Sequence, residues 1–585
     1  MFKPILSQNL TGNVISPTPL APLAIPLEAA QRSRPLFKNK HLSNWAAELP
    51  IGNTSVAAHQ MLEKLKLLNV CRYHYKDRLQ LHNTLRPVFG ELLHAIRQPL
   101  RQANIPLDQQ QLYRAALLQD LLEQMALGYK LIVRELSSLT KLKEYDTFLL
   151  TEAIYMATVY LSQRLVDAYG LYAPEPTHAW SDLNRLYAFA EARNLHVQQV
   201  DDPHPNTALP IRLTIDFSYK RMLLLALAEP YHLMQYEADD MFRLISSSVE
   251  NCHIEAFTEI VTQGEYVLDL DADYGPKFII DKAQWQANVP RLVDISIVKQ
   301  QLNLHLDRLL SSSLQNTEFD AVSLVERQQR DMLLRLADAW NASLVRKTQR
   351  FALAAQVELT SGLNAAHYYM SEQGQFTPEM DELKLATNFN AQSISNKNDT
   401  VLATAHKEAM QKDQRYKDQH YQLNPWSQHN ISPIGIALNC EQAGNTIDAR
   451  VGELVTYRMT ERKHQRWQIG VIRWLKHEFE YNREGKINVG IMNIASTAIP
   501  IGTKAVKGLG NGTDYFRSLL VPKQISINQT RSLIVPALLY DVGTIVAVNM
   551  KQKIFYAKLN RMLISTRCFT QFNFEVVQRP VEFLL

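Results

Sequence analysis

The apolar residues between about Asn44 and Phe351 recur every three or four positions, which is the spacing of one face of an α-helix. The clearest stripe comprises Leu118, Leu121, Leu122, Met125, Tyr129, Ile132 and Leu136. A second runs from Ile154 to Tyr169 and ends at Gly170. No repeat of fixed length is recognisable. We therefore predict helical packing over residues 41–368, with these stripes as its core.

The period of the apolar positions changes to two after Trp426. Trp467, Ile469 and Val471 lie on one side of such a run, and similar short runs follow as far as Val577. Short alternating runs separated by Gly, Pro and Asn are typical of antiparallel barrels and sandwiches. The predicted fold class is therefore α+β and multidomain, with an all-helical N-terminal region followed by a C-terminal antiparallel β-barrel.

Composition suggests the remaining boundaries. Residues 1–40 carry six prolines, which remove backbone donors and predict an extended leader. Residues 369–425 are rich in Asn, Gln, Lys and Asp and are interpreted as a polar linker. The first β module is expected over 426–497. Residues 498–585 are expected to form a β-rich extension or a second β subdomain.

The net charge of +4 is unevenly distributed. Residues 426–585 contain 20 Lys and Arg against 11 Asp and Glu, whereas residues 1–425 contain 42 against 47. A basic module behind a mildly acidic one indicates that the C-terminal part meets an anion, or that it carries a solvated basic face.

The cysteines and the hydropathy pattern indicate a cellular compartment. Cys71, Cys252, Cys440 and Cys568 are widely separated and show neither a disulfide framework nor a zinc-ligand spacing, which suits a reducing environment. No apolar run approaches the roughly 20 residues of a membrane span. We expect a cytoplasmic protein without a membrane span, a metal or a cofactor.

One short polar motif stands at the start of the β module. The sequence WSQHNISPIGIAL places Asn430, Ser432 and Gly435 in the pattern N-x-S-x-x-G. Asn and Ser can bond nearby backbone or the edge of a ligand, and Gly allows a close approach of backbone. By itself the pattern also fits an ordinary turn that opens a strand. The runs that follow it are RVGELVTYRM, WQIGVIRWLK and INVGIMNIA.

This succession resembles the PilZ domain family over about residues 426–497. In that family a D/N-x-S-x-x-G element opens a small antiparallel barrel, and later strands carry runs similar to Gly470–Trp474 and Val489–Ile491. The helical region is also similar to the N-terminal part of larger bacterial PilZ proteins, in the segments KLKLLNVCRYHYKDRLQLHNTLRP and KRMLLLALAEPYHL.

The resemblance implies binding of cyclic di-GMP, with Asn430, Ser432 and Gly435 holding guanine and phosphate. Family members also place an arginine pair, R-x-x-x-R, before the barrel. Here Arg415 is followed four residues later by Gln419, so the pair is missing. Arg415 and Lys417 are the expected cationic ligands, although lysine lacks the planar fork of arginine. The nearby cations Arg458, Arg462, Lys463, Arg466 and Arg473 could add anion contacts or could protect a sheet edge.

The predicted function is that of a signalling adaptor that binds cyclic di-GMP and passes its state to a protein partner through the helical region. A scaffold that no longer binds nucleotide is the first alternative, favoured by the missing arginine. Nucleic-acid binding by the basic barrel is a less favoured third. An enzyme is not expected, because no catalytic motif occurs. Asp269, Asp271 and Asp273 resemble the opening of a calcium loop but do not complete one, which favours a turn with a solvated acidic face.

Overall fold

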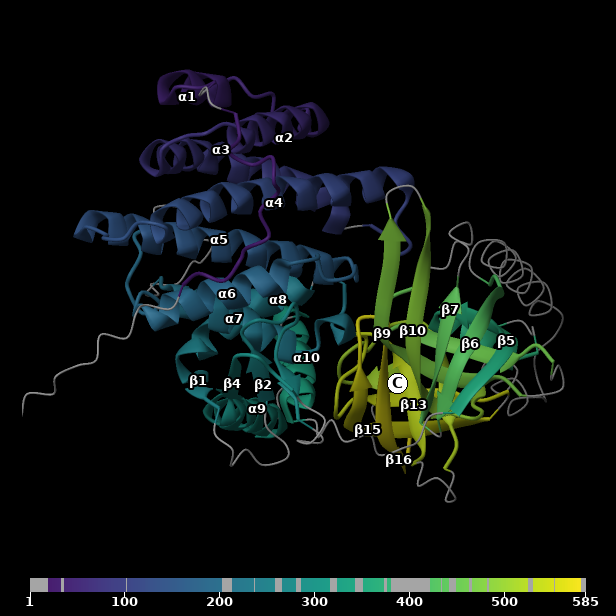
Figure 1. Ribbon diagram of the computed structural model, residues 1–585. Helices are drawn as coiled ribbons and strands as arrows, with labels where there is room; N and C mark the ends of the chain where they lie inside the picture. The colour runs from purple at the N-terminus through teal and green to yellow at the C-terminus, as the bar shows by residue number, and fades with distance from the viewer. Residues whose placement is uncertain are drawn as a thin grey trace, which may run out of the picture.

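A computed structural model gives the fold. It describes residues 19–579, except 33–35, 102, 203–212, 236, 258–265, 280–285, 316–323, 342–350, 373–375, 380–420, 433, 441–448, 462–465, 481–482, 524–529 and 552. Figure 1 shows a stack of helices beside two β-barrels. The predicted α+β multidomain class is therefore confirmed.

The helices of the first half of the described chain are stacked on one another in chain order (Figure 1). They are α1 (Asn39–Ala47), α2 (Thr54–Val70), α3 (Tyr75–Arg101), α4 (Gln109–Ser137), α5 (Glu144–Gly170), α6 (Ala179–Ala192), α7 (Ile215–Leu227) and α8 (Glu237–Leu244), with the 3₁₀ turns η1 (Pro230–His232) and η2 (Ile245–Asn251). Asp108 begins α4 with a capping box that it forms with Gln111. The stripe from Leu118 to Leu136 is buried on α4, as predicted.

The chain before α1 is attached to this stack by a buried ion pair. Lys130 on α4 and Asp182 on α6 lie 2.7 Å apart, with side chains 3% and 1% exposed. Asp182 accepts the backbone N–H of Ala24, and Lys130 donates to the Ala24 carbonyl. The extended backbone around Ala24 thus completes the hydrogen bonding of a pair that would otherwise be costly to bury.

A small antiparallel sheet follows the stack, in a region where the sequence indicated only helices. Its strands are β1 (His253–Ala256), β2 (Tyr266–Asp269), β3 (Lys277–Phe278) and β4 (Pro290–Asp294), in the order β1-β4-β2-β3. Strands of two to five residues are too short to show a period of two, so pattern analysis misses them. Helices α9 (Ser296–Gln315) and α10 (Leu324–Asn341) follow.

The acidic loop after β2 has a structural use. Asp273 accepts the backbone N–H groups of His178 and Ser181 at the start of α6, and Asp271 forms an ion pair with Arg185 on that helix. Asp269 is buried and accepts the backbone N–H of Val289 at 3.0 Å. Asp271 and Asp273 thus join the loop to α6, whereas Asp269 holds the loop to the chain before β4. Within the described chain, no cluster of His, Cys, Asp or Glu is arranged to hold a metal.

The first barrel is closed in the order β10-β7-β6-β5-β8-β9. Its strands are β5 (Phe351–Ser361), β6 (Asn424–Ser432), β7 (Gly435–Cys440), β8 (Leu454–Met459), β9 (Gln468–Glu480) and β10 (Arg483–Ala495). The sequence placed Phe351–Ser361 in the helical region and began the β module at Trp426. The structure assigns that segment to the barrel, because it pairs with both β6 and β8 over a long sequence separation.

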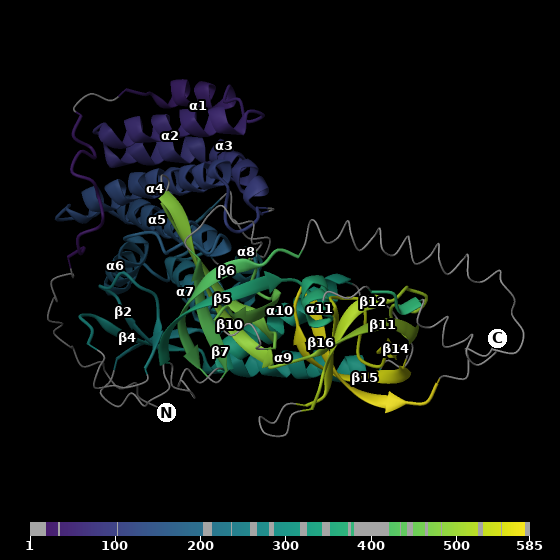
Figure 2. The same ribbon diagram turned by 90° about the vertical axis from the view of Figure 1, so that its right-hand side faces the viewer.

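The second barrel occupies the segment expected to be a β-rich extension. It closes in the order β11-β12-β13-β16-β15-β14. The strands are β11 (Ile499–Lys507), β12 (Phe516–Val521), β13 (Ser532–Pro536), β14 (Ile545–Asn549), β15 (Ile554–Ser565) and β16 (Phe569–Val577). Figure 2 shows this barrel beside the first, with α11 (Leu363–Met370) between them.

The three parts share buried contacts. An apolar cluster that includes Leu454 and Ile469 of the first barrel and Leu519 and Phe569 of the second joins the two barrels. The backbone N–H of His477 on β9 donates to the Tyr172 carbonyl of the helical stack at 2.8 Å. Among the helices that the structure describes, none is both long and apolar enough for a membrane span.

Candidate functional site

The N-x-S-x-x-G motif forms a hairpin at one end of the first barrel. Asn430 and Ser432 end β6, and Gly435 begins β7. The Ser432 hydroxyl donates to the Gly435 carbonyl at 3.2 Å, and the Ile434 carbonyl accepts the backbone N–H of Asn493 on β10. The structure therefore brings these three predicted residues together on one turn that is fastened to a third strand.

A β-bulge decides which way Asn430 faces. Gln428 pairs with Leu438, whose side chain is in the barrel core, and both side chains are buried. The register then shifts by one residue, so that Asn430 pairs with Ala437 rather than with the core residue Ile436. Because strand side chains alternate between faces, the extra residue at His429 turns Asn430 to the outer face of the barrel.

Asn430 lies in a row of residues that crosses this outer face. The registers place Ala352, Asn430, Ala437, Gly490 and Trp474 opposite one another on β5, β6, β7, β10 and β9. We call these five residues the outer row. Ala437 and Gly490 are buried, Gly490 beneath the Trp474 ring, whereas the Asn430 amide and the Trp474 indole are partly exposed. An amide beside an aromatic ring suits a flat polar molecule.

Packing explains the glycines of the motif and of the two later runs. A Cβ at Gly435 would lie 2.3 Å from the carbonyl oxygen of Ile491, and one at Gly470 would lie 2.4 Å from the Ile491 side chain. A Cβ at Gly490 would lie 1.8 Å from Nε1 of Trp474, whose ring lies over that glycine. These residues are needed for close strand and ring contacts around the outer row.

Positive charge collects at the β9 end of the outer row. Lys476 pairs with Asn488 in the adjacent outward-facing row, and its Nζ lies 4.8 Å from the Tyr231 ring centre on η1. Burial, together with the charges of Arg473 and Lys476, lowers the pKa of His232, also on η1, to about 4. His232 is therefore neutral at physiological pH, and the two cations outnumber the carboxylate that lies beside it, Glu229, which favours an anion at this end.

The other cations noted in the sequence do not gather at the motif. Arg458 forms a 2.8 Å ion pair with Glu358 and lies over the Trp467 ring. Glu358 also pairs with Pro425, five residues before Asn430, so Arg458 lies roughly 16 Å along the strand from the motif. Arg466 is exposed.

Four cationic candidates cannot be placed. Arg462 and Lys463, and the predicted ligands Arg415 and Lys417, lie outside the described residues.

Two features near the motif were missed by sequence reasoning. Gln428 is 4% exposed on the core side of β6, and neither its amide nitrogen nor its amide oxygen has a hydrogen-bond partner in the described structure. Lys476 was not singled out, because its position next to the outer row depends on the pairing of β9 with β10. The alternation of β9 would have shown only that it faces away from the core.

Comparison with known proteins assigns this architecture. Three family models match consecutive parts of the chain: the N-terminal domain of the cyclic-di-GMP receptor FimW over residues 40–259, its middle PilZ domain over 266–430 and 380–500, and the FimW C-terminal beta-barrel domain over 501–577. The middle match contains β5 and the whole N-x-S-x-x-G hairpin. The chain therefore belongs to the PilZ domain family.

A curated relative aligns with nearly the whole chain. The cyclic-di-GMP receptor FimW of Pseudomonas aeruginosa is 26% identical to this chain over 563 residues, covering 92% of this chain and 90% of the relative. No solved structure matches the chain.

Proposed function

We propose that this protein is a receptor for cyclic di-GMP and that the outer row of the first barrel, with the N-x-S-x-x-G hairpin, receives the ligand. The observation that carries the proposal is the bulge at His429, which turns Asn430 outward into the row that contains the Trp474 indole. The relative that aligns over nearly the whole chain is named as a receptor for that ligand.

Each predicted residue has a chemical role in this proposal. The Asn430 amide offers both a donor and an acceptor to the edge of a guanine, and the Ser432 hydroxyl can turn to a phosphate or ribose oxygen. Gly435 keeps the hairpin against β10. Arg415 and Lys417 would supply charge to the phosphates from the segment before β6, together with Lys476 from β9.

The helical region would respond to ligand binding through η1. Tyr231 and His232 on η1 lie against the same end of β9 that carries Lys476 and Arg473. A dianion at this end would neutralise charge that now faces η1 and would change how η1 packs on the barrel. We propose that the helical stack passes this change to a protein partner, and that the protein acts in the cytoplasm as an adaptor rather than as an enzyme.

The missing arginine pair favours a second candidate function. If Arg415 with a lysine cannot replace R-x-x-x-R, the barrel would be a scaffold that no longer binds nucleotide. Loss of one charged, bidentate contact costs about 1.5–3 kcal/mol, or roughly tenfold to a hundredfold in affinity. The scaffold function requires that the remaining contacts do not compensate for this loss.

Calorimetric titration of the intact chain with cyclic di-GMP tests the choice. We expect saturable binding to the unaltered protein, and a loss of about tenfold or more in Asn430→Ala. Asn44→Ala is the matched control, because Asn44 is an exposed asparagine on α1, in the helical stack. Absence of heat at high micromolar dinucleotide would reject the receptor and leave the scaffold.

A further inference from the structure

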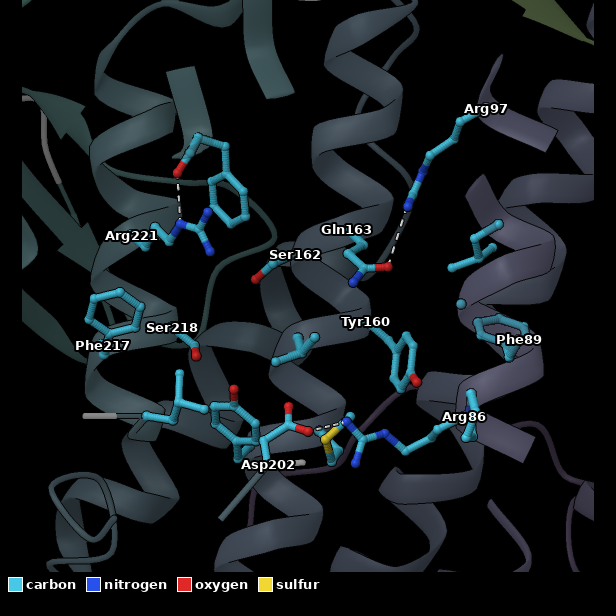
Figure 3. Close-up of a pocket in the computed structure, with 18 of the residues that line it drawn as sticks. Arg86, Phe89, Arg97, Tyr160, Ser162, Gln163, Asp202, Phe217, Ser218 and Arg221 are labelled. Atoms are coloured by element: carbon cyan, nitrogen blue, oxygen red, sulfur yellow. Dashed lines mark hydrogen bonds and ion pairs between the residues drawn. The ribbon is translucent and has the colours of Figure 1, made fainter. Parts of the chain in front are cut away.

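A second enclosed site lies in the helical stack, far along the chain from the barrel motif. A cavity of about 210 Å³ opens between α3, α5 and α7 (Figure 3). Arg86, Arg97, Tyr160, Ser162, Phe217 and Arg221 contribute to its wall. Buried arginines are usually paired with carboxylates, and two of the three arginines at this cavity form such an ion pair.

Two of the three arginines are neutralised by carboxylates. Arg86 forms an ion pair with Asp202. Arg97 binds Asp167 through Nε at 2.8 Å and through Nη2 at 2.6 Å, a bidentate arrangement that uses the carboxylate fully. Their positive charge is therefore satisfied within the protein.

Arg221 on α7 is different. It is 6% exposed, its Nε donates to the Phe242 carbonyl at 2.7 Å, and its guanidinium carbon lies 3.7 Å from the Phe242 ring centre. No hydrogen bond or ion pair within the described residues uses its two NH2 groups. Burial lowers the pKa of Arg221 to about 10, so it is still charged at neutral pH. Asp239 on α8 attracts this charge without a direct ion pair, so the four donor hydrogens of the NH2 groups remain available to a bound anion.

Ser162 on α5 provides a second donor without a partner. It is 3% exposed, and its hydroxyl oxygen has no hydrogen-bond partner in the described structure. Figure 3 shows this hydroxyl directed toward the side of the cavity where Arg221 lies. A guanidinium and a hydroxyl that converge on one space form a receptor for a carboxylate or phosphate oxygen.

Aromatic and aliphatic side chains form another part of the wall. Phe89, Tyr155, Tyr160 and Phe217 line the cavity beside the two donors. Aromatic walls favour a flat apolar body, whereas the small volume excludes a molecule as large as a cyclic dinucleotide. The ligand of this site is thus distinct from the ligand proposed for the barrel.

We propose that the cavity between α3, α5 and α7 binds a small organic anion, with its carboxylate or phosphate group on Arg221 and Ser162 and its flat apolar part between the aromatic rings. The helical stack would then carry a ligand site of its own. The site does not depend on the proposed function of the barrel.

Titration of the full-length protein with four probes tests the proposal: benzoate, phenyl phosphate, the neutral isostere benzamide, and inorganic phosphate. We expect benzoate or phenyl phosphate to bind at least tenfold more tightly than benzamide and than inorganic phosphate. Equal binding of benzamide would overturn the role of charge, and equal binding of inorganic phosphate would overturn the role of the aromatic wall. Absence of binding by both organic anions would reject the site.

Variants then assign the residues. Arg221→Met should reduce binding of the anionic probe by tenfold or more, and Ser162→Ala by a smaller factor. Arg134→Met is the matched control, because Arg134 is an exposed arginine on α4 and does not line the cavity. Unchanged affinity in a folded Arg221→Met would overturn the assignment. If that variant does not fold, the Ser162→Ala protein and the charge dependence of the four probes decide the question.

Discussion

The α-carbon of Gly435 on β7 lies so close to β10 that a Cβ there would be 2.3 Å from the carbonyl oxygen of Ile491. The obstacle is backbone within a barrel, so no side chain can move aside to relieve it. Gly435, the last residue of the N-x-S-x-x-G motif, can occupy this position because it has no side chain.

Gly435→Ala is therefore expected to destabilise the first barrel by about 1–3 kcal/mol, the usual cost of overpacking. The measurement is the midpoint of chemical denaturation, followed by tryptophan fluorescence. Gly170→Ala is the control, because a Cβ at Gly170 would meet nothing within 4 Å. Equal midpoints for the two variants would contradict the close contact.

Lys130→Met should destabilise the helical stack and release the chain around Ala24. The substitution leaves Asp182 buried without its cation, and removing one partner of a buried pair costs about 3–5 kcal/mol. Limited proteolysis should show earlier cleavage near Leu20–Leu27. Lys66→Met removes an exposed lysine of the same stack that pairs with Glu63, and should leave the cleavage pattern unchanged.

The free energy of unfolding should decrease as the pH is lowered through the mildly acidic range, and His82 accounts for part of this decrease. Burial lowers the pKa of His82 from 6.5 to about 4. Between these values the unfolded chain binds a proton that the folded protein does not, so acidification favours unfolding through this window and adds nothing further below it. The full effect is roughly 3 kcal/mol for one such histidine.

The variant His82→Gln cannot take up this proton, so its free energy of unfolding should change less between pH 6.5 and pH 4. Denaturant titrations at several pH values would measure the difference. His94→Gln, at an exposed position of the same helix α3, should keep the slope of the unaltered protein. An identical slope for His82→Gln would show that the imidazole is not kept neutral by burial.

The segment before β6 decides how strongly cyclic di-GMP is held in our proposal. Arg415→Ala should weaken binding by roughly tenfold to a hundredfold, because it removes the one arginine left of the usual pair. Gln419→Arg restores the R-x-x-x-R spacing and should strengthen binding by a similar factor. Calorimetry on the intact chain measures both. A gain in Gln419→Arg without detectable binding by the unaltered protein would support the scaffold function.

The sequence by itself determined the two kinds of secondary structure and the position of the motif. The stripe from Leu118 to Leu136 predicted α4, and the change of period after Trp426 predicted the barrel strands, since both patterns are local and follow from which side of an element is buried. The resemblance of residues 426–497 to the PilZ domain family is confirmed by the match of the middle domain.

Only the tertiary structure decided which residues meet. Strand β5 joins a barrel whose next strand begins more than sixty residues later. Lys476 lies beside the outer row because of the register in which β9 pairs with β10. The cavity at Arg221 combines α3, α5 and α7 in the same way. A local pattern shows which side of a strand or helix is buried, but not its partner, because pairing is set by the free energy of the whole packed core.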